Sequence, residues 1–129
     1  MIYEFGNVAI NVNDTITSVW YEESCNTLYV ARNALNTTSF LDVTKKEFNE
    51  AAKKIVKENS NMIFISENDL LNVNNMLSYE TFKKGDKILV TLTVIVEEKY
   101  QKWAYTYEDE LQYVVLVTNM KEACNWEFK

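Results

Sequence analysis

The sequence predicts a single α+β domain over residues 1–129, built from a mainly antiparallel β-sheet and one amphipathic helix. Three observations lead to this prediction. Short segments in which apolar and polar residues alternate cluster toward both ends of the chain. One segment between them, 45–58, has helical periodicity and a capping signal. Strands and helices do not alternate regularly, so we expect about six to eight antiparallel strands with the helix packed on one face.

The first strands follow from period-two patterning and from turn residues. Apolar residues alternate with polar ones over 8–12, and Asn13-Asp14 has the composition of a turn. Two more strands are predicted over 15–22 and 27–32, so the three segments together predict an antiparallel meander. The next segment, 33–42, has no periodic pattern and is expected to be a loop.

The helix over 45–58 has the clearest local signal in the chain. Thr44 and Glu47 have the spacing of a capping box, and Val43 and Phe48 occupy the positions of a hydrophobic staple. Five apolar residues recur on one side of this helix: Phe48, Ala51, Ala52, Ile55 and Val56. This stripe predicts burial against the sheet, although a partner-binding surface would show the same pattern.

The C-terminal half is expected to complete the sheet. A short apolar run predicts a buried strand over 62–65, and five alternating apolar residues predict a long central strand over 87–98. Between them, three leucines fit one side of a second short helix over 68–77, although three asparagines lower its helix propensity. The last expected strands lie over 100–107, 111–118 and 123–128. The first two of these would form a hairpin with an acidic tip of three residues, Glu108, Asp109 and Glu110.

The composition excludes several classes of chemistry. The chain has no histidine, so it has no Ser-His-Asp or Cys-His constellation. It has only two glycines, which excludes a glycine-rich phosphate loop. Its two cysteines, Cys25 and Cys124, match no metal spacing, and we expect both to be reduced in a cytoplasmic protein. No signal peptide and no apolar stretch long enough to span a membrane is evident.

The charge balance bears on the class of partner. The net charge is −6 at pH 7, and the chain has one arginine, so binding of nucleic acid through an extended basic surface is not expected. The acidic excess is compatible with a protein partner that has a basic surface, while solubility alone would explain it equally well.

The predicted C-terminal hairpin is the main candidate for a binding surface. Trp103, Tyr105 and Tyr107 share one face of their strand, and the acidic tip would lie beside them. Tyrosine and tryptophan often dominate binding energy because they are large, stiff and amphipathic. The alternative is that all three rings pack in the core. A second candidate is the strand end that contains Trp20, Glu22 and Glu23.

Three clusters of carboxylates have the composition of catalytic or metal sites. Glu22 and Glu23, like Glu97 and Glu98, are adjacent residues that a regular strand would direct to opposite faces. The acidic tip lacks the spaced oxygen ligands of a calcium loop. We therefore predict no metal, no cofactor and no catalytic residue.

The leading hypothesis is a small, non-enzymatic protein that occupies a surface of a protein partner. Its abundant Asn, Lys, Ile and Glu suggest an AT-rich genome, and small acidic proteins encoded by phages and mobile elements inhibit host defence proteins, as anti-CRISPR proteins do. Such a protein would act in the host cytoplasm. Toxin immunity and virion assembly are further alternatives, and an enzyme using a carboxylate or lysine is less favoured.

The second hypothesis is a protein that sequesters a small ligand or nucleotide. Its pocket would lie between the helix and the curved sheet and be lined by tyrosines and tryptophans. A phosphorylated ligand would require cations, and outside the helix the candidates are Arg32, Lys83, Lys84 and Lys87.

Overall fold

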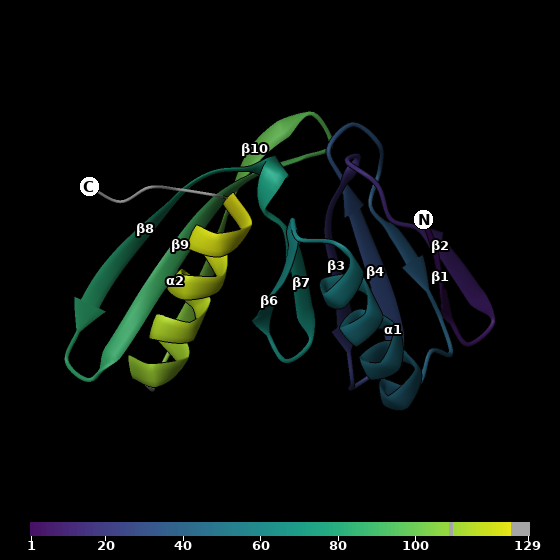
Figure 1. Cartoon of the computed structure of the whole chain (residues 1–129), viewed down its shortest axis with the longest axis horizontal. Helices are drawn as coiled ribbons and strands as arrows, with labels where there is room; N and C mark the ends of the chain where they lie inside the picture. Colours follow the sequence, from purple (N-terminus) through teal and green to yellow (C-terminus); the bar gives the residue numbers. More distant parts are fainter. Residues whose placement is uncertain (109, 125–129) are drawn as a thin grey trace.

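The computed structural model describes residues 1–108 and 110–124 (Figure 1). Within these residues the chain forms ten strands in three antiparallel sheets and two α-helices, which confirms the α+β class and exceeds the expected strand number. The elements are β1 (Ile2–Phe5), β2 (Val8–Asn11), β3 (Ile16–Glu22), β4 (Thr27–Arg32), β5 (Thr38–Phe40), α1 (Lys45–Glu58), β6 (Met62–Ser66), β7 (Asp69–Asn72), the 3₁₀ turn η1 (Val73–Asn75), β8 (Met76–Lys84), β9 (Lys87–Val96), β10 (Lys99–Tyr107) and α2 (Glu110–Cys124).

A five-stranded sheet with the order β5-β4-β3-β7-β6, here called the central sheet, is buried on both faces. Its strands alternate between two separate cores. In β3, Val19 and Tyr21 belong to the core that contains α1, whereas Trp20 packs against the other core. In β7, Leu70 and Leu71 divide in the same way. Successive side chains of a strand point to opposite faces, so two cores require apolar residues on both sides of this sheet.

The predicted helix α1 covers the first face of the central sheet. Thr44 accepts a hydrogen bond from the Glu47 amide, and the Glu47 carboxylate accepts one from the Thr44 amide, which confirms the capping box. The buried side of the helix holds four of the five stripe residues, Phe48, Ala51, Ala52 and Ile55, with Val56 partly buried beside them. The stripe is therefore part of the core.

A small sheet formed by β1 and β2 completes the first core on the other side of α1. Tyr3 is buried there and donates a hydrogen bond of 2.6 Å to Glu58 at the end of the helix. The expected meander was wrong in part: β3 pairs with β4, but β2 pairs with β1, a strand that the sequence pattern did not predict.

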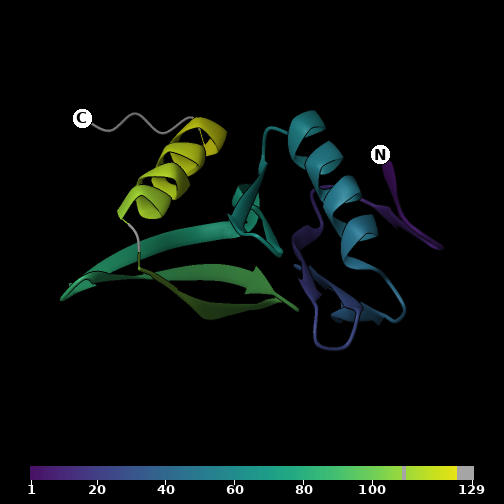
Figure 2. The same ribbon diagram turned by 90° about the horizontal axis from the view of Figure 1, so that it is seen from below.

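A three-stranded sheet with the order β10-β9-β8, here called the outer sheet, forms the second core together with α2 (Figure 2). The helix lies across the inner face of this sheet, with Leu116 and Met120 buried. Five apolar side chains of β9 face the same core: Ile88, Val90, Leu92, Val94 and Val96. Thr17 and Arg32 of the central sheet join the two sheets, because the Thr17 hydroxyl donates to the Ile95 carbonyl at 2.6 Å and the Arg32 carbonyl accepts from the Glu97 amide at 2.9 Å.

Two predicted secondary structures were wrong. The segment 68–77 forms β7, η1 and the start of β8 instead of a helix, because Leu70 and Leu71 are needed in different cores. The segment 111–118 belongs to α2 instead of a strand, so the chain enters a helix after β10 and the acidic hairpin tip does not form. The described part of 123–128 also belongs to α2, and the rest lies outside the described residues.

Two loop boundaries also differ from the prediction. The long strand β9 ends at Val96, and Glu97 and Glu98 form the turn to β10 with φ angles of 53° and 67°. A pair of left-handed residues is the geometry of a two-residue hairpin turn, which usually contains Asn or Gly. The expected loop 33–42 contains the short strand β5, which pairs with β4.

Candidate functional site: an aromatic pocket between two sheets

Side chains from the central and outer sheets line a small, open pocket of about 160 Å³. Its lining residues define the aromatic pocket: Ser18, Trp20, Asp69, Trp103 and Tyr105. They come from β3, β7 and β10, strands that are distant in the sequence and converge because the two sheets pack on each other. The pocket is therefore a product of tertiary structure.

Strand pairing places Trp20 at the centre of this group. Its Cα pairs with Tyr29 of β4 on one side and with Asp69 of β7 on the other. The Trp20 and Tyr29 rings stack, with centroids 5.2 Å apart and planes within 10°. The Trp103 ring meets Trp20 edge to face, with centroids 6.0 Å apart and an interplanar angle of 72°. Offset and edge-to-face pairs are the favoured arrangements of aromatic rings, so this cluster is stable as built.

Three of the polar side chains that line the pocket form hydrogen bonds within the protein. The Asp69 carboxylate accepts a hydrogen bond from the Ser66 hydroxyl across the β6–β7 turn. The Ser18 hydroxyl donates to the Leu70 carbonyl at 2.6 Å, and the Trp103 indole donates to Gln101 at 3.2 Å. Among the described residues, the Tyr105 hydroxyl has no hydrogen-bond partner. The pocket thus contains a carboxylate and a phenol that can still bind a ligand.

The electrostatics of the pocket are dominated by desolvation. Burial raises the pKa of Asp69, the neighbouring Glu22 charge raises it further, and the Ser66 hydrogen bond opposes both effects. Burial, followed by the charge of Asp69, raises the pKa of Tyr105 well above its ordinary value. The same two causes raise the pKa of Tyr107 to about 12. Asp69 is therefore a poorly hydrated carboxylate beside tyrosines that stay neutral.

The structure brings together three of the aromatic residues that the sequence singled out. Trp103 and Tyr105 share the inner face of β10 as predicted, and Trp20 meets them from β3. Tyr107 lies on the same face but is buried, and its hydroxyl donates to the Ile65 carbonyl at 2.7 Å. Tyr107 therefore has a structural role. For this residue the alternative prediction, that the rings of the strand pack in the core, is the one observed.

The acidic residues expected beside these rings lie elsewhere. Glu108 is exposed and forms a surface ion pair of 3.7 Å with Lys87, while Glu110 is the first residue of α2. Asp109 lies outside the described residues. Glu22 is exposed on the same face of β3 as Trp20, and among the described carboxylates that the sequence singled out it is the one whose charge acts on Asp69.

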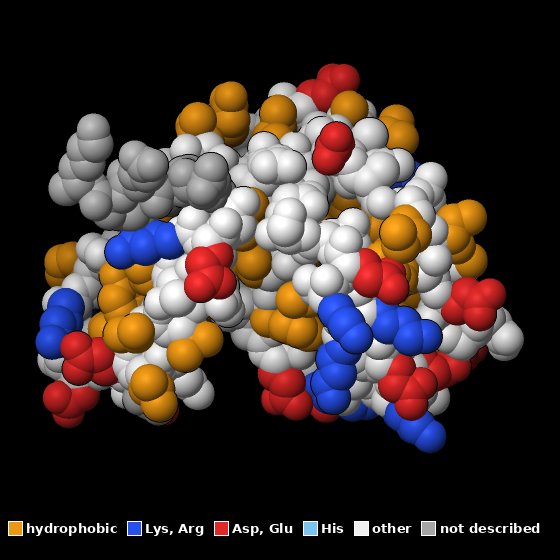
Figure 3. Space-filling model, viewed as in Figure 1, with side chains coloured by type: hydrophobic (Ala, Val, Ile, Leu, Met, Phe, Trp, Pro, Cys, Tyr) orange, Lys and Arg blue, Asp and Glu red, His pale blue; other side chains and the backbone are white. Residues whose placement is uncertain are grey.

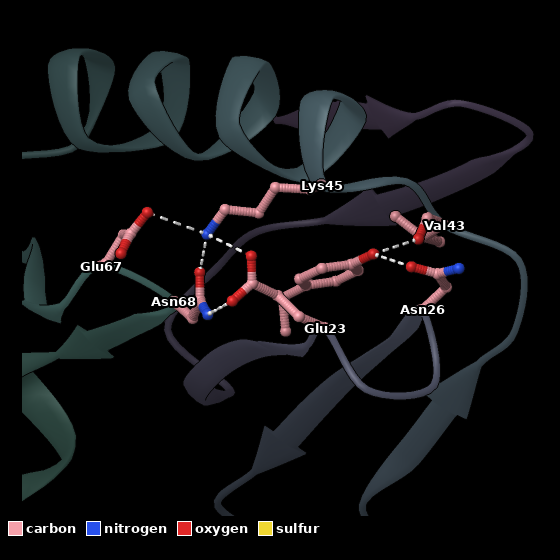
Figure 4. A network of polar contacts seen from close by, with 7 residues as sticks. Glu23, Asn26, Val43, Lys45, Glu67 and Asn68 are labelled. Atoms are coloured by element: carbon pink, nitrogen blue, oxygen red, sulfur yellow. Dashed lines mark hydrogen bonds and ion pairs between the residues drawn. The ribbon is translucent and has the colours of Figure 1, made fainter.

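Glu23 belongs to a polar network on the opposite side of the strand end (Figure 4). The Lys45 ammonium lies 3.6 Å from Glu23 and 3.3 Å from Glu67 and also contacts the Asn68 side chain. Nearby, the Tyr21 hydroxyl lies within hydrogen-bond distance of the Val43 carbonyl, at 2.7 Å, and of the Asn26 side chain, at 2.8 Å. The network ties the β3–β4 and β6–β7 turns to the start of α1, so Glu23 is a structural residue.

Asp69 and Ser18 were not identified from the sequence. Asp69 follows the short turn after β6, where an acidic residue is ordinary turn chemistry. The pairing of β3 with β7 places Asp69 opposite Trp20 and so brings it into the aromatic pocket. Recognition of β7 as a strand could have placed Asp69 in the sheet, but the segment 68–77 was predicted to be a helix.

A larger groove follows β6, the edge strand of the central sheet. Three neighbouring hollows of about 270, 370 and 330 Å³ share Phe64 and are bordered by α1 or α2. Figure 3 shows the surface hollowed between the two helices, with hydrophobic side chains in the hollow. Neither tryptophan of the aromatic pocket lines this groove, so the ligand site predicted between helix and sheet does not coincide with the aromatic cluster.

The cations considered for a phosphorylated ligand do not line the aromatic pocket either. Lys83, Lys84 and Lys87 flank the β8–β9 turn, and Arg32 ends β4. Within 1–108 and 110–124, no three metal-ligating side chains come together. Across the described part of the chain, neither helix is long and apolar enough to cross a membrane. Comparison with protein-family models, curated proteins and solved structures finds no match for this chain.

Proposed function

We propose that this is a non-enzymatic binding protein that holds a basic side chain of a protein partner in the aromatic pocket. The observation that carries the proposal is the convergence of Trp20, Trp103 and Tyr105 around the poorly hydrated carboxylate of Asp69. A cation gains attraction from the faces of aromatic rings and from the carboxylate. A ligand cation would also supply the solvation that Asp69 lost on folding.

The size of the pocket favours a side chain over a whole small molecule. Ligand sites for drug-sized molecules typically occupy about 300–1,000 Å³. The cavity here is about 160 Å³, which suits the head group of one lysine or arginine side chain. A nucleotide would have to remain largely outside it. For the aromatic pocket, this comparison favours a side chain of a protein partner over a nucleotide.

The charge of the molecule supports the same type of partner. The net charge is −6, and Glu22 adds a carboxylate near the pocket. Complementary charge accelerates encounter and disfavours acidic partners, including nucleic acids. By occupying a basic surface of its partner, the protein would prevent the partner from binding other molecules at that surface. This is the mode of action expected for an inhibitor of a host defence protein. The exposed free thiol of Cys25 is compatible with action in a reducing cytoplasm.

The test is a comparison of two positions on β10. Once affinity capture from source cells has identified a partner, Kd is measured for the unaltered protein and for Trp103→Leu, which keeps an apolar side chain in the core. The expected loss is at least about thirtyfold, equivalent to about 2 kcal/mol. Tyr100→Ala is the matched control, because Tyr100 is on the same strand, 66% exposed and outside the pocket.

The control should bind like the unaltered protein. If Trp103→Leu folds normally by circular dichroism and binds the partner with an unchanged Kd, the pocket is not the contact surface and the proposal is wrong.

A further inference from the structure

We infer that the aromatic pocket is selective for an N-methylated ammonium group, carried by a methylated lysine of the protein partner. The inference rests on the proposed function and specifies the chemistry of the group that enters. It follows from the aromatic lining of the pocket, the acceptors inside it and its size.

Both indoles line the pocket. Trp20 and Trp103 contact each other edge to face, with centroids 6.0 Å apart and planes at 72°, so a cation would lie against the indole surfaces that face the pocket and not between the two rings. Cation–π attraction is effective within about 6 Å of a ring centroid and is strongest for tryptophan. Tyr105 adds a third ring. Stacking of Tyr29 on the Trp20 ring holds that indole in place before a ligand arrives.

The hydrogen-bonding inventory distinguishes a methylated ammonium from an unmodified one. A lysine ammonium has three N–H donors, and each needs an acceptor once water is removed. Three of the five residues that line the pocket are aromatic, and aromatic rings pack well against methyl groups and are weak acceptors. The Ser18 hydroxyl is directed to the Leu70 carbonyl, so the acceptors left in the pocket are the Asp69 carboxylate, which also accepts from Ser66, and the Tyr105 hydroxyl. Methylation removes donors and adds apolar surface, so it lowers the cost of entry while the charge remains.

The carboxylate supplies the balancing charge. Asp69 lines the same cavity as the three rings, and a cation in the pocket would be close to it. A dimethylammonium group also keeps one N–H that can donate to this carboxylate. A trimethylammonium group keeps only the charge attraction.

The cavity volume fits such a group. The volume of about 160 Å³ is below the range typical of drug-sized ligands and leaves room for a small head group. A methylated ammonium can displace water that gains little from the aromatic walls. The alkyl chain of the lysine would extend outward to the partner.

The experiment titrates the full chain with two sets of probes by isothermal calorimetry. The first set is one lysine peptide in unmodified, dimethylated and trimethylated forms. The second is choline and 3,3-dimethylbutan-1-ol, which have almost the same shape but differ in charge. We expect the methylated peptides to bind at least about tenfold more tightly than the unmodified peptide. We expect choline to bind at least about tenfold more tightly than the neutral alcohol, because only the cation is attracted by the rings and by Asp69.

Three variants locate the binding. Trp103→Leu and Asp69→Asn should each weaken the methylated peptides by at least about tenfold, and the exposed control Tyr100→Ala should leave them unchanged. Asp69→Asn keeps the size of the side chain, so it remains informative if Trp103→Leu is poorly folded.

The outcomes separate this inference from the proposed function. Equal binding of methylated and unmodified peptides, or no binding of either at millimolar concentration, overturns the inference. If the pocket variants nevertheless bind the protein partner more weakly, the proposed function stands, and the side chain that enters the pocket is an unmodified lysine or arginine. If choline binds more tightly than every peptide, the ligand is a small quaternary amine and the methyl-lysine assignment is wrong.

Discussion

Gly6 offers a sharp test of how the first core is assembled. It lies in the β1–β2 turn with a φ of 64°, and a Cβ at this position would lie 1.8 Å from a carboxylate oxygen of Glu47. That carboxylate accepts the Thr44 amide at 2.9 Å, as half of the capping box of α1. Gly6→Ala should therefore strain the turn and displace Glu47 from its hydrogen bond.

The expected cost has two parts. An alanine in the left-handed region costs about 1–2 kcal/mol, and loss of one capping hydrogen bond costs about 1 kcal/mol. The sum is about 2–3 kcal/mol. For a chain of 129 residues, we expect each kcal/mol to lower Tm by about 4 °C, so the total is roughly 8–12 °C. In a Glu47→Ala background the displaced side chain is absent, and Gly6→Ala should cost only the backbone strain.

The assay is urea unfolding, followed by circular dichroism, of the unaltered protein, the two single variants and the double variant. A coupling free energy of about 1 kcal/mol between Gly6→Ala and Glu47→Ala is expected. Additivity within about 0.3 kcal/mol would show that Gly6 and Glu47 are not in contact and would refute the reasoning.

Three further predictions concern stability. Ile55→Ala should lower the free energy of unfolding in urea by about 2–4 kcal/mol because Ile55 is fully buried, and Thr44→Ala should lower it by about 1 kcal/mol through the lost cap. Unchanged unfolding midpoints would contradict the structural role of α1. The raised pKa of Asp69 means that its contribution to stability is present below pH 3.8 and is lost as pH rises through the folded-state pKa. Asp69→Asn should therefore gain stability relative to the unaltered protein between pH 3 and 7, and a pH-independent difference would exclude this linkage. Since Cys25 is a free thiol, reductant should leave Tm unchanged, and a lower Tm would reveal a stabilising disulfide.

The predictable parts of the fold are those specified by local signals. The helix α1 was predicted with its observed bounds because its cap and its apolar stripe lie within one short segment. The strands β2 and β9 followed from apolar residues at every second position. Such patterns are read from neighbours in the sequence, so tertiary contacts are not needed to recognise them.

The helix α2 was not predictable in this way. Val114, Val115 and Val117 are β-branched and favour strands. In the structure, α2 buries Leu116 and Met120, while Val114 and Val115 remain about half exposed. Apolar residues therefore occur on both sides of the helix, and their spacing does not show a clear helical period. The turn at Glu97 and Glu98 was missed for a related reason, because glutamate is not a usual residue for left-handed turn positions.

The aromatic face of β10 was predictable, but the pocket was not. Period two placed Trp103 and Tyr105 on one side of their strand. Trp20 reaches them only because the central and outer sheets pack together, and Asp69 reaches Trp20 only through the register of β7. Neither relation leaves a pattern within one segment of the sequence. The sequence could therefore indicate aromatic residues of interest, but it could not identify the carboxylate among them.

Two polar residues of β7 show why Asp69 points to function. Asn72 is completely buried, and its side chain is fully used: it donates to the Ile16 carbonyl at 2.9 Å and accepts from Asn61 and from the Asn74 amide at 3.0 Å each. Asn72 therefore stabilises the fold. Asp69 has one side-chain hydrogen bond, from Ser66, and burial makes its ionised form costly. The ionised Asp69 carboxylate therefore lowers the stability of the folded protein, and it lies beside three aromatic residues that line the same pocket. A ligand cation that restored the solvation lost by this carboxylate on folding would explain its position.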